Sequence, residues 1–178
     1  MQGIKLLKKH GVEWNAMAVV NAYNVNHPME FYRFFKENGC QFLQFTPIVE
    51  RLTRHEDGRT LASLADKDEI SLSEASVTPE QWGYFLSAIF DEWVRKDVGK
   101  IFVEIFDCTL ANWMGISPGI CAYSKECGHA GVMEHNGDVY SCDHFVFPEY
   151  KLGNIRDHSL IDMLYGEQQQ EFSRLKHS

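Results

Sequence analysis

The sequence predicts an α/β protein in two parts. The first is a run of parallel strands and helices of the kind found in parallel sheets and barrels. The second is a small α+β module that carries cysteines and a β-hairpin. Strand-like and helix-like segments alternate through the first part, and this alternation stops near residues 107–115. Three cysteines then follow, spaced around an Asn-Gly turn signal.

The first segments are predicted to form a helix and then a strand. Residues 3–10 (GIKLLKKH) read as one amphipathic helix that ends at Gly11, a residue type typical of the position after a helix. The apolar run over residues 12–20 indicates a strand. Because the chain opens on a helix, we expect it to be the later part of a longer α/β repeat.

The next segments predict a parallel βαβ unit. Pro28 suits the first turn of a helix over residues 28–38, and Gly39 ends that helix. Residues 41–47 (QFLQFTP) then form a second strand. Strand, helix and strand with short connections imply that the two strands run parallel.

Residues 49–77 are charged and polar and show no regular period. We expect a long surface excursion, which is either a functional lid or a solvated loop. A well-signalled helix over residues 79–97 follows, with Thr78 and Gln81 forming a capping box. Its apolar stripe predicts core packing and consists of Trp82, Phe85, Leu86, Ile89 and Trp93.

A third parallel strand is predicted over residues 101–106, after which Asp107 is expected to cap a short helix. The change of pattern places a domain boundary near residues 107–115, which gives domains at 1–110 and 111–178. In the second domain we expect a short strand within YKLGNI. Helices are expected over residues 159–165 and 167–175.

Cys121, Cys127 and Cys142 form the most informative pattern in the chain. The pair Asn136-Gly137 favours a type I′ turn, with strands over residues 131–135 and 138–142. Such a hairpin folds the chain back on itself and can bring the three thiols together, as in a metal or iron–sulfur site. The remaining cysteines, Cys40 and Cys108, are expected to be core thiols.

Two other interpretations remain open on the residues alone. One is a structural zinc module in which His129 or His144 completes a Cys3His set. The other is a metal-free interaction domain that binds a partner through residues 51–77. The three histidines of the hairpin region, His129, His135 and His144, are otherwise expected to be exposed polar residues.

Composition limits the setting of the protein. The net charge of −8 provides no basic field for nucleic acid. No apolar run reaches the ~18 residues that a membrane-spanning helix needs. The odd number of cysteines, 5 in 178 residues, does not favour a secreted disulfide framework. We therefore expect a cytoplasmic protein.

The chain resembles a known enzyme family along nearly its whole length. Cys127-x9-Gly137-x4-Cys142 is similar to the opening of the SPASM signature, an iron–sulfur extension of radical S-adenosylmethionine (SAM) barrels. The segment GHAGVMEHNGDVYSCDHFVFPEYKLGNI, together with Cys121, resembles the anaerobic sulfatase-maturating enzymes. VEWNAMAVVNAYNVNHPMEFYRFFKENGCQFLQFTPIVER resembles the fifth and sixth strand region of their barrel.

The resemblance implies an activity and a set of site residues. These enzymes oxidise a cysteine or serine of a client sulfatase to formylglycine, using S-adenosylmethionine and [4Fe–4S] clusters. An electron donor such as a ferredoxin or flavodoxin would be a further partner. By the family pattern, Cys121, Cys127 and Cys142 ligate an auxiliary cluster, and Asp143 is the general base. Without the resemblance, Asp143 would be read as a turn residue at the hairpin exit.

Parts of the family pattern are absent from this sequence. It contains neither the Cys-x3-Cys-x2-Cys loop that binds the SAM cluster nor the later SPASM cysteines. We therefore expect an internal fragment, from the late barrel to the early SPASM region, that is inactive by itself. We also expect its auxiliary cluster to be absent or incomplete, because the family places the fourth ligand beyond residue 178.

Overall fold

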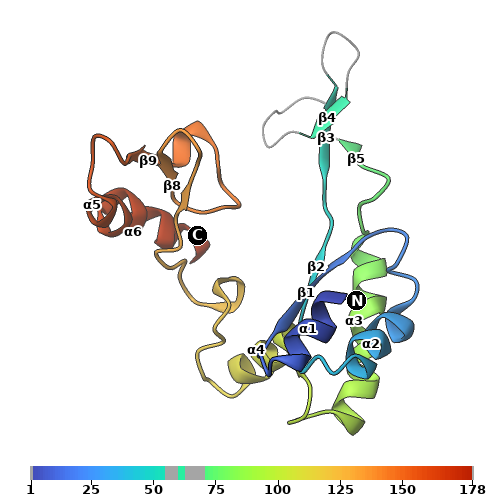
Figure 1. The fold of residues 1–178 in the computed structure, drawn as a ribbon. Coiled ribbons are helices and arrows are strands. Elements are labelled where there is room, and N and C mark those ends of the chain that lie inside the picture. The colour runs from blue at the N-terminus through green and yellow to red at the C-terminus, as the bar shows by residue number, and fades with distance from the viewer. Residues whose placement is uncertain (1, 55–59, 63–70, 178) are drawn as a thin grey trace. The chain divides into compact units, whose positions relative to one another are not determined.

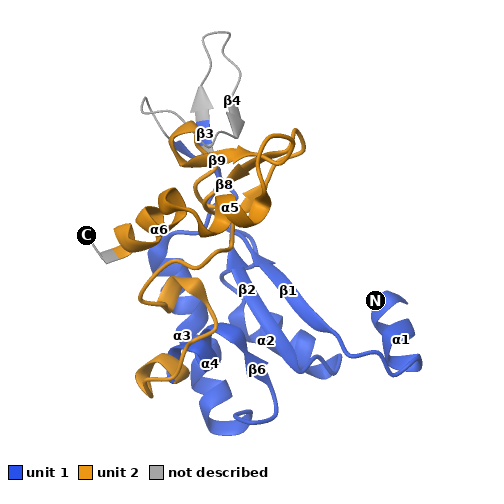
Figure 2. Cartoon of the chain, turned by 90° about the vertical axis from the view of Figure 1, so that its left-hand side faces the viewer, with its two compact units in different colours: residues 1–63, 68–110 blue, residues 64–67, 111–178 orange. Residues whose placement is uncertain are grey.

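The computed structural model describes residues 2–54, 60–62 and 71–177 (Figure 1). These residues fall into two compact units (Figure 2). The first contains the described residues up to 110, and the second contains residues 111–177. The first unit is a parallel sheet with helices and the second is built on a small antiparallel sheet, so the predicted α/β class is confirmed.

Three parallel strands form the sheet of the first unit: β1 (Asn15–Val20), β2 (Phe42–Pro47) and β6 (Phe102–Val103). β2 lies in the centre and pairs with both neighbours, in a register that aligns Asn15 with Phe42 and Phe42 with Phe102. The predicted parallel βαβ unit is confirmed. β1 begins at residue 15 rather than residue 12, because β2 starts only at Phe42 and Asn15 is its pairing partner.

Helices α1 (Gln2–Lys9), α2 (Pro28–Glu37) and α3 (Pro79–Lys96) agree with the sequence prediction. The capping box of α3 is formed in both directions: the Gln81 amide donates to Thr78 Oγ1, and the Thr78 amide donates to Gln81 Oε1. Gly11 follows α1 and Gly39 follows α2, both at positive φ, where a glycine ends a helix at little cost.

Alternate side chains of the strands face the core of the first unit. Ala18 and Val20 are buried, whereas Met17 and Val19 are 72% and 53% exposed. The α3 stripe packs on the buried face, with Phe85, Ile89 and Trp93 almost fully buried and Trp82 and Leu86 beside them, as predicted. The other core residues are Val25, Tyr32, Cys40, Leu43, Phe45, Val77, Ile101, Val103 and Phe106.

The predicted strand over residues 101–106 is wrong beyond residue 103. β6 has only two paired residues, and the chain enters helix α4 (Glu104–Trp113) directly. Helical backbone from residue 104 places Ile105 and Phe106 on the core, where Phe106 packs against Trp93 with ring centroids 5.3 Å apart. Asp107 therefore lies in the first turn of this helix and not before its start, as the predicted cap would require.

The charged segment after β2 contains short antiparallel strands: β3 (Arg51–Arg54), β4 (Thr60–Ala62) and β5 (Ser71–Leu72). β3 lies between the other two. The lack of periodicity in this stretch predicts a long surface excursion, and its described residues add these short strands, because backbone pairing needs no apolar alternation. Residues 55–59 and 63–70 of the predicted excursion lie outside the described residues.

The second unit is built on an antiparallel sheet of β7 (Val132–Met133), β8 (Asp138–Tyr140) and β9 (Lys151–Asn154), with β8 in the centre. Helices α5 (Leu160–Tyr165) and α6 (Glu167–Arg174) follow it, close to the predicted bounds. The 3-10 helices are η1 (Cys121–Tyr123), η2 (Pro148–Tyr150) and η3 (Leu175–His177).

The hairpin between β7 and β8 is present, but its turn differs from the predicted type I′. The Gly137 amide donates to the Glu134 carbonyl, so His135 and Asn136 are the central residues of the turn. Gly137 follows at φ 89°, and the Glu134 amide donates to the Asp138 carbonyl. This is a three-residue loop closed by a glycine in the left-handed region. The Asn136 side chain favours it by accepting from the Asp138 amide.

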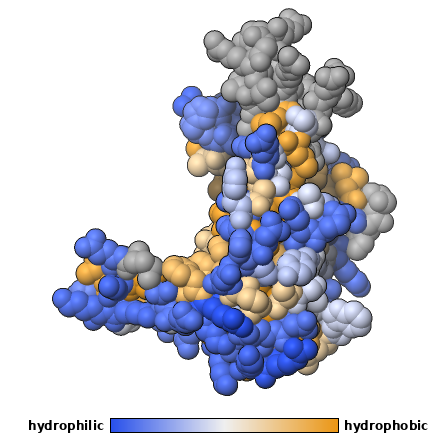
Figure 3. All heavy atoms as spheres, turned by 90° about the vertical axis from the view of Figure 1, so that its right-hand side faces the viewer, coloured by the Kyte–Doolittle hydropathy of each residue, from blue (hydrophilic) through white to orange (hydrophobic). Residues whose placement is uncertain are grey.

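Within the described residues, no helix has both the length and the apolar character needed to cross a bilayer. Hydrophilic residues dominate the lower half of the face drawn in Figure 3, where α2 and α3 lie. Ion pairs join α2 to α3 and to the residue that caps it, with Arg33 at 2.9 Å from Glu92 and Lys36 at 2.6 Å from the buried Asp97 carboxylate.

Candidate metal centre

A cavity of about 430 Å³ in the second unit is lined by Cys121, Cys127 and Cys142 together. Cys121 opens η1, Cys127 lies in the loop before β7, and Cys142 lies two residues beyond β8. The structure thus brings three separate segments to one hollow. All three cysteines are free thiols.

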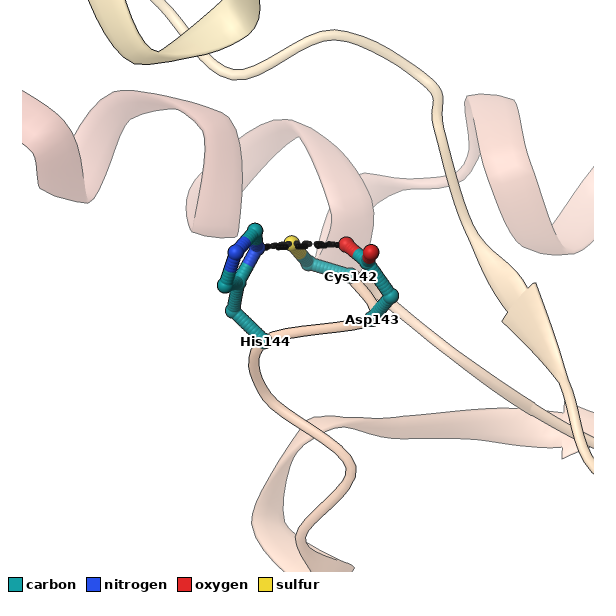
Figure 4. Close-up of side chains that lie close together, drawn as sticks. All are labelled: Cys142, Asp143 and His144. Atoms are coloured by element: carbon teal, nitrogen blue, oxygen red, sulfur yellow. Dashed lines mark hydrogen bonds and ion pairs between the residues drawn. The ribbon is translucent and has the colours of Figure 1, made fainter. Parts of the chain in front are cut away.

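Cys142 lies at the centre of a tight group of potential ligands. Its Sγ is 3.4 Å from Asp143 Oδ1 and 3.6 Å from His144 Nδ1, and the ligand atoms of the three residues lie within 4.8 Å of one another. Figure 4 shows the carboxylate and the imidazole on opposite sides of the sulfur. Asp143 and His144 are exposed, whereas Cys142 is half-buried.

The environment of Cys142 favours its neutral thiol when no cation is bound. Burial raises the pKa of the Cys142 thiol, and the nearby Asp143 carboxylate adds to this rise. A cation at this sulfur would reverse the balance, because a coordinated cysteine binds as the thiolate and releases its proton.

The histidines of the hairpin region, His129, His135 and His144, are exposed, as predicted. His144 lines the same cavity as the three cysteines. His129 lies at a different cavity, where its ring stacks on Tyr165 and its Nδ1 is 2.7 Å from the Leu164 carbonyl oxygen. Of the two histidines considered for a zinc site, His144 is therefore the better placed.

The donor set and the cavity fit an iron–sulfur group. Cysteine thiolates are the usual ligands of such clusters, and three of them face one hollow. Phe145, Tyr150 and Phe172 line the same cavity, with their ring centroids 5.2–5.5 Å apart in edge-to-face contacts. An apolar surrounding is one of the features that tune the potential of an iron–sulfur cluster.

The other two cysteines do not belong to this centre. Cys40 is fully buried in the core, as predicted, and burial raises the pKa of its thiol. Cys108 lies on α4 and is only partly buried, so its assignment to the core is wrong. It was placed after a six-residue strand, whereas the helix that begins at Glu104 turns it partly outward.

A second hollow, of about 480 Å³, lies at the amino-terminal ends of the parallel strands. Asn15, Phe42 and Phe102 line it together with Glu104 and Asp107 from α4. Burial raises the pKa of the Asp107 carboxyl, and its Oδ2 is buried without a hydrogen-bond partner. No sequence pattern predicted this hollow, because it depends on where β6 ends.

No sequence pattern identified the residues that hold the cysteine segments in place. Gln169, Ser173 and Lys176 donate hydrogen bonds to carbonyl oxygens at or beside the three cysteines. All three lie at the C-terminal end of the chain, in α6 and η3. A run of three glutamines, residues 168–170, does not reveal which of them is buried.

The chain matches known proteins along its whole length. Residues 124–178 match SPASM, an iron–sulfur cluster-binding domain. A serine-type anaerobic sulfatase-maturating enzyme of Bacteroides thetaiotaomicron is 65% identical over 177 residues, which are 99% of this chain and 43% of the relative. A cysteine-type anaerobic sulfatase-maturating enzyme of Clostridium novyi is 31% identical over 165 residues, which are 92% of this chain and 40% of the relative.

Solved structures show the same fold. The structure of native anSMEcpe with bound AdoMet is 28% identical, with a TM-score of 0.77 over 99% of this chain and 45% of that one. A second structure, with AdoMet and the Cp18Cys peptide, has a TM-score of 0.78 at 27% identity and covers 99% and 46% of the two chains. The chain spans about two fifths of the length of the curated relatives it matches. These likenesses confirm the resemblance seen in the sequence: the chain is a homologue of the anaerobic sulfatase-maturating radical SAM enzymes and carries their SPASM iron–sulfur sequence.

Proposed function

We propose that this chain acts within an enzyme that oxidises a serine of a client sulfatase to formylglycine. Residues 1–110 would form the later part of the radical SAM barrel, and residues 111–178 the first part of the SPASM domain. The observation that carries the proposal is the single cavity lined by Cys121, Cys127 and Cys142, with the Asp143 carboxylate 3.4 Å from the Cys142 sulfur. The 65% identity to a serine-type relative supports serine over cysteine as the client residue.

Cys121, Cys127 and Cys142 would hold an auxiliary [4Fe–4S] cluster through their thiolates. The iron–sulfur groups and S-adenosylmethionine of the complete enzyme supply the one-electron chemistry that removes a hydrogen atom from the client residue. The contribution of this unit is structural: it presents three sulfur donors from separate segments, with a wall of aromatic rings beside them.

Asp143 is the group in this chain that is suited to take a proton from the client. Oxidation of a seryl side chain to an aldehyde requires loss of a Cβ hydrogen atom, the hydroxyl proton and one further electron, which an iron–sulfur group of the complete enzyme would accept. The Asp143 carboxylate is exposed and adjacent in sequence to Cys142, so a client residue can reach it. A carboxylate within hydrogen-bond reach of the hydroxyl can act as general base.

The first unit supports the barrel assignment. One face of its parallel sheet is covered by the core, and the opposite face exposes Met17, Val19, Phe42 and Phe102. In a (β/α) barrel, such strand residues face the interior. The complete enzyme would act in the cytoplasm, with a sulfatase polypeptide as client. A ferredoxin or flavodoxin would be its electron donor.

Metal analysis separates this proposal from the zinc module and the metal-free interaction domain. The chain should be produced and purified anaerobically with iron and sulfide present, and its iron, acid-labile sulfide and zinc measured. Iron together with sulfide supports the cluster. Stoichiometric zinc, for which His144 is placed to be the fourth ligand, would favour the zinc module instead. Because the fourth ligand of the family pattern is not in this chain, a small thiol should be added to complete the set of four. A chain that retains neither metal even then would favour the interaction domain.

A chimeric enzyme tests the activity. This chain would replace the matching 177 residues of the Bacteroides thetaiotaomicron relative, and formylglycine would be measured by mass spectrometry on serine and cysteine client peptides. We expect conversion of the serine peptide. Asp143→Asn should lower its rate by about 10²–10⁴-fold, the usual cost of losing a general base. Cleavage of S-adenosylmethionine should persist in that variant.

Asp162→Asn is the matched control, because Asp162 is an exposed carboxylate on α5, away from the cavity lining. It should keep the wild-type rate. If Asp143→Asn also kept that rate with its clusters intact, Asp143 would be only a turn residue at the hairpin exit.

A further inference from the structure

We propose that one stripe of α6 and η3 presets the three sulfur donors, with Gln169 as its central positioning residue. The stripe consists of Gln169, Phe172, Ser173 and Lys176. These residues follow the i, i+3, i+4 and i+7 spacing that places side chains on one side of a helix. The inference rests on the proposed function, since it takes Cys121, Cys127 and Cys142 to be ligands.

Gln169 joins two of the cysteine segments. Its side chain is fully buried, and its Nε2 donates to the Gly128 carbonyl at 3.0 Å and to the Ser141 carbonyl at 3.2 Å. Gly128 directly follows Cys127, and Ser141 directly precedes Cys142. The two hydrogens of one amide group thus fix the distance between the main chains next to two ligands.

Ser173 and Lys176 extend this arrangement along the same side. Ser173 Oγ donates to the Cys127 carbonyl, and the Cys127 amide donates back to the Ser173 carbonyl at 3.3 Å. Lys176 Nζ donates to the Cys121 carbonyl. Every cysteine of the cavity therefore has a main-chain carbonyl, its own or that of an adjacent residue, bonded to this C-terminal stripe.

Phe172 fixes the stripe to the cavity wall. Its ring lies 5.5 Å from the rings of both Phe145 and Tyr150, measured between centroids. Phe172 is buried and belongs to the cavity lining. The same helix therefore shapes the apolar wall and positions the segments that carry the three cysteines around one cavity.

A glutamine suits the central position for a chemical reason. Its amide offers two hydrogens, which match two carbonyl acceptors. Methionine has nearly the same shape but no hydrogen-bond donor. Glutamate would place its carboxylate oxygens against the carbonyl oxygens of Gly128 and Ser141. Gln169→Met is therefore the variant that removes the hydrogen bonds with the least change of volume.

The test measures metal binding and its spectrum in the full 178-residue chain. The reduced, metal-free chain is titrated anaerobically with Co²⁺, whose sulfur-to-metal absorption reports how many thiolates bind and in what geometry. Removal of groups that orient metal ligands typically costs about 10–100-fold in affinity. We expect Gln169→Met to bind Co²⁺ at least tenfold more weakly, with a reduced or shifted sulfur-to-metal band. Gln170→Met is the control, because Gln170 is exposed and its side-chain amide donates to the Tyr165 carbonyl rather than to a cysteine segment.

A second pair of variants, at the exposed residue Lys176, keeps the test decisive where Gln169→Met does not fold. Lys176→Met removes the donor to Cys121, whereas Lys176→Arg keeps one. We expect weaker Co²⁺ binding in the first and recovery in the second, with unchanged circular dichroism in both.

The possible failures are distinguishable. If Gln169→Met and Lys176→Met both bind Co²⁺ with the wild-type affinity and spectrum, the positioning role is overturned and the ligand assignment stands. If Gln169→Met does not fold, the Lys176 pair decides in the same way. If the wild-type chain shows no sulfur-to-metal band, the cysteines are not ligands, and this inference and the proposed cluster are overturned together.

Discussion

Gly137 closes the hairpin that carries the chain to Cys142, and Gly137→Ala should loosen that hairpin. Gly137 lies at φ 89°, a region that L-residues with a Cβ rarely adopt. A Cβ built there would lie 3.1 Å from Asn154 Oδ1 and 3.2 Å from Ile155 Cγ1, so both neighbours would have to shift. Asn154 is not free to shift, because its amide donates to the Asn136 carbonyl and to Asp138 Oδ1.

The expected cost follows from these terms. Left-handed backbone costs a non-glycine residue about 1–2 kcal/mol, and the tight contacts add to this. The lower entropy of alanine in the unfolded chain offsets about 0.4–1 kcal/mol. We therefore expect a net loss of about 1–2 kcal/mol in the local stability of this hairpin, which corresponds to a factor of about 5–30 in the opening equilibrium.

Hydrogen exchange of single amides is the appropriate assay, because it reports each region separately. The Glu134 and Ser141 amides are bonded to the Asp138 and Tyr150 carbonyls, and they should exchange about 5–30-fold faster in Gly137→Ala. Gly128→Ala is the matched control, since Gly128 has open space at its Cβ position and no positive φ. Equal exchange rates in Gly137→Ala and the wild type would refute the strain argument.

Three further predictions concern the first unit and the thiols. Tyr32→Phe should lose about 1.5–3 kcal/mol of unfolding free energy, because the buried phenol donates to the Asp97 carboxylate at 2.9 Å. Burial, and after it the bond to Asp97, raises the pKa of Tyr32 above the ordinary tyrosine value of 10. The contribution of Tyr32 to the unfolding free energy is therefore complete below pH 10. Above pH 10 the tyrosine ionises in the unfolded chain first, so this contribution should decline by up to ~1.4 kcal/mol per pH unit. Denaturant unfolding at increasing pH measures the decline. Thr78→Ala should cost about 1 kcal/mol in the same assay, through loss of the capping box at α3. In the reduced, metal-free chain, iodoacetamide should label exposed Cys121 first and leave buried Cys40 unlabelled until unfolding, as peptide mass spectrometry can follow.

Each of these has a control or a contrary result. Tyr84→Phe, at an exposed tyrosine, should keep both the stability and its pH dependence. A Tyr32→Phe chain whose stability falls above pH 10 as steeply as that of the wild type would contradict the role of Tyr32. Unchanged stability in Thr78→Ala would mean that α3 is fixed by packing alone. Labelling of Cys40 at the rate of Cys121 would contradict its burial.

The sequence by itself determined those features that depend on neighbouring residues. The capping box at Thr78 joins positions three apart, and the stripe of α3 follows one helical period, so both were predicted correctly. The parallel pairing of β1 and β2 followed from the helix between them. The three cysteines stood out because their residue type is rare and their spacing encloses a turn signal.

Tertiary structure decided the rest, because the deciding contacts join residues far apart in the chain. β6 ends at Val103 because Phe106 must reach the core beside Trp93 from a helix, and the apolar run over residues 101–106 fits a strand equally well. The choice of Gln169 among three consecutive glutamines rests on bonds to Gly128 and Ser141, which are 41 and 28 positions away. Local sequence fixes periodicity and caps, whereas the ends of elements and the partners of buried polar groups depend on what the folded chain brings beside them.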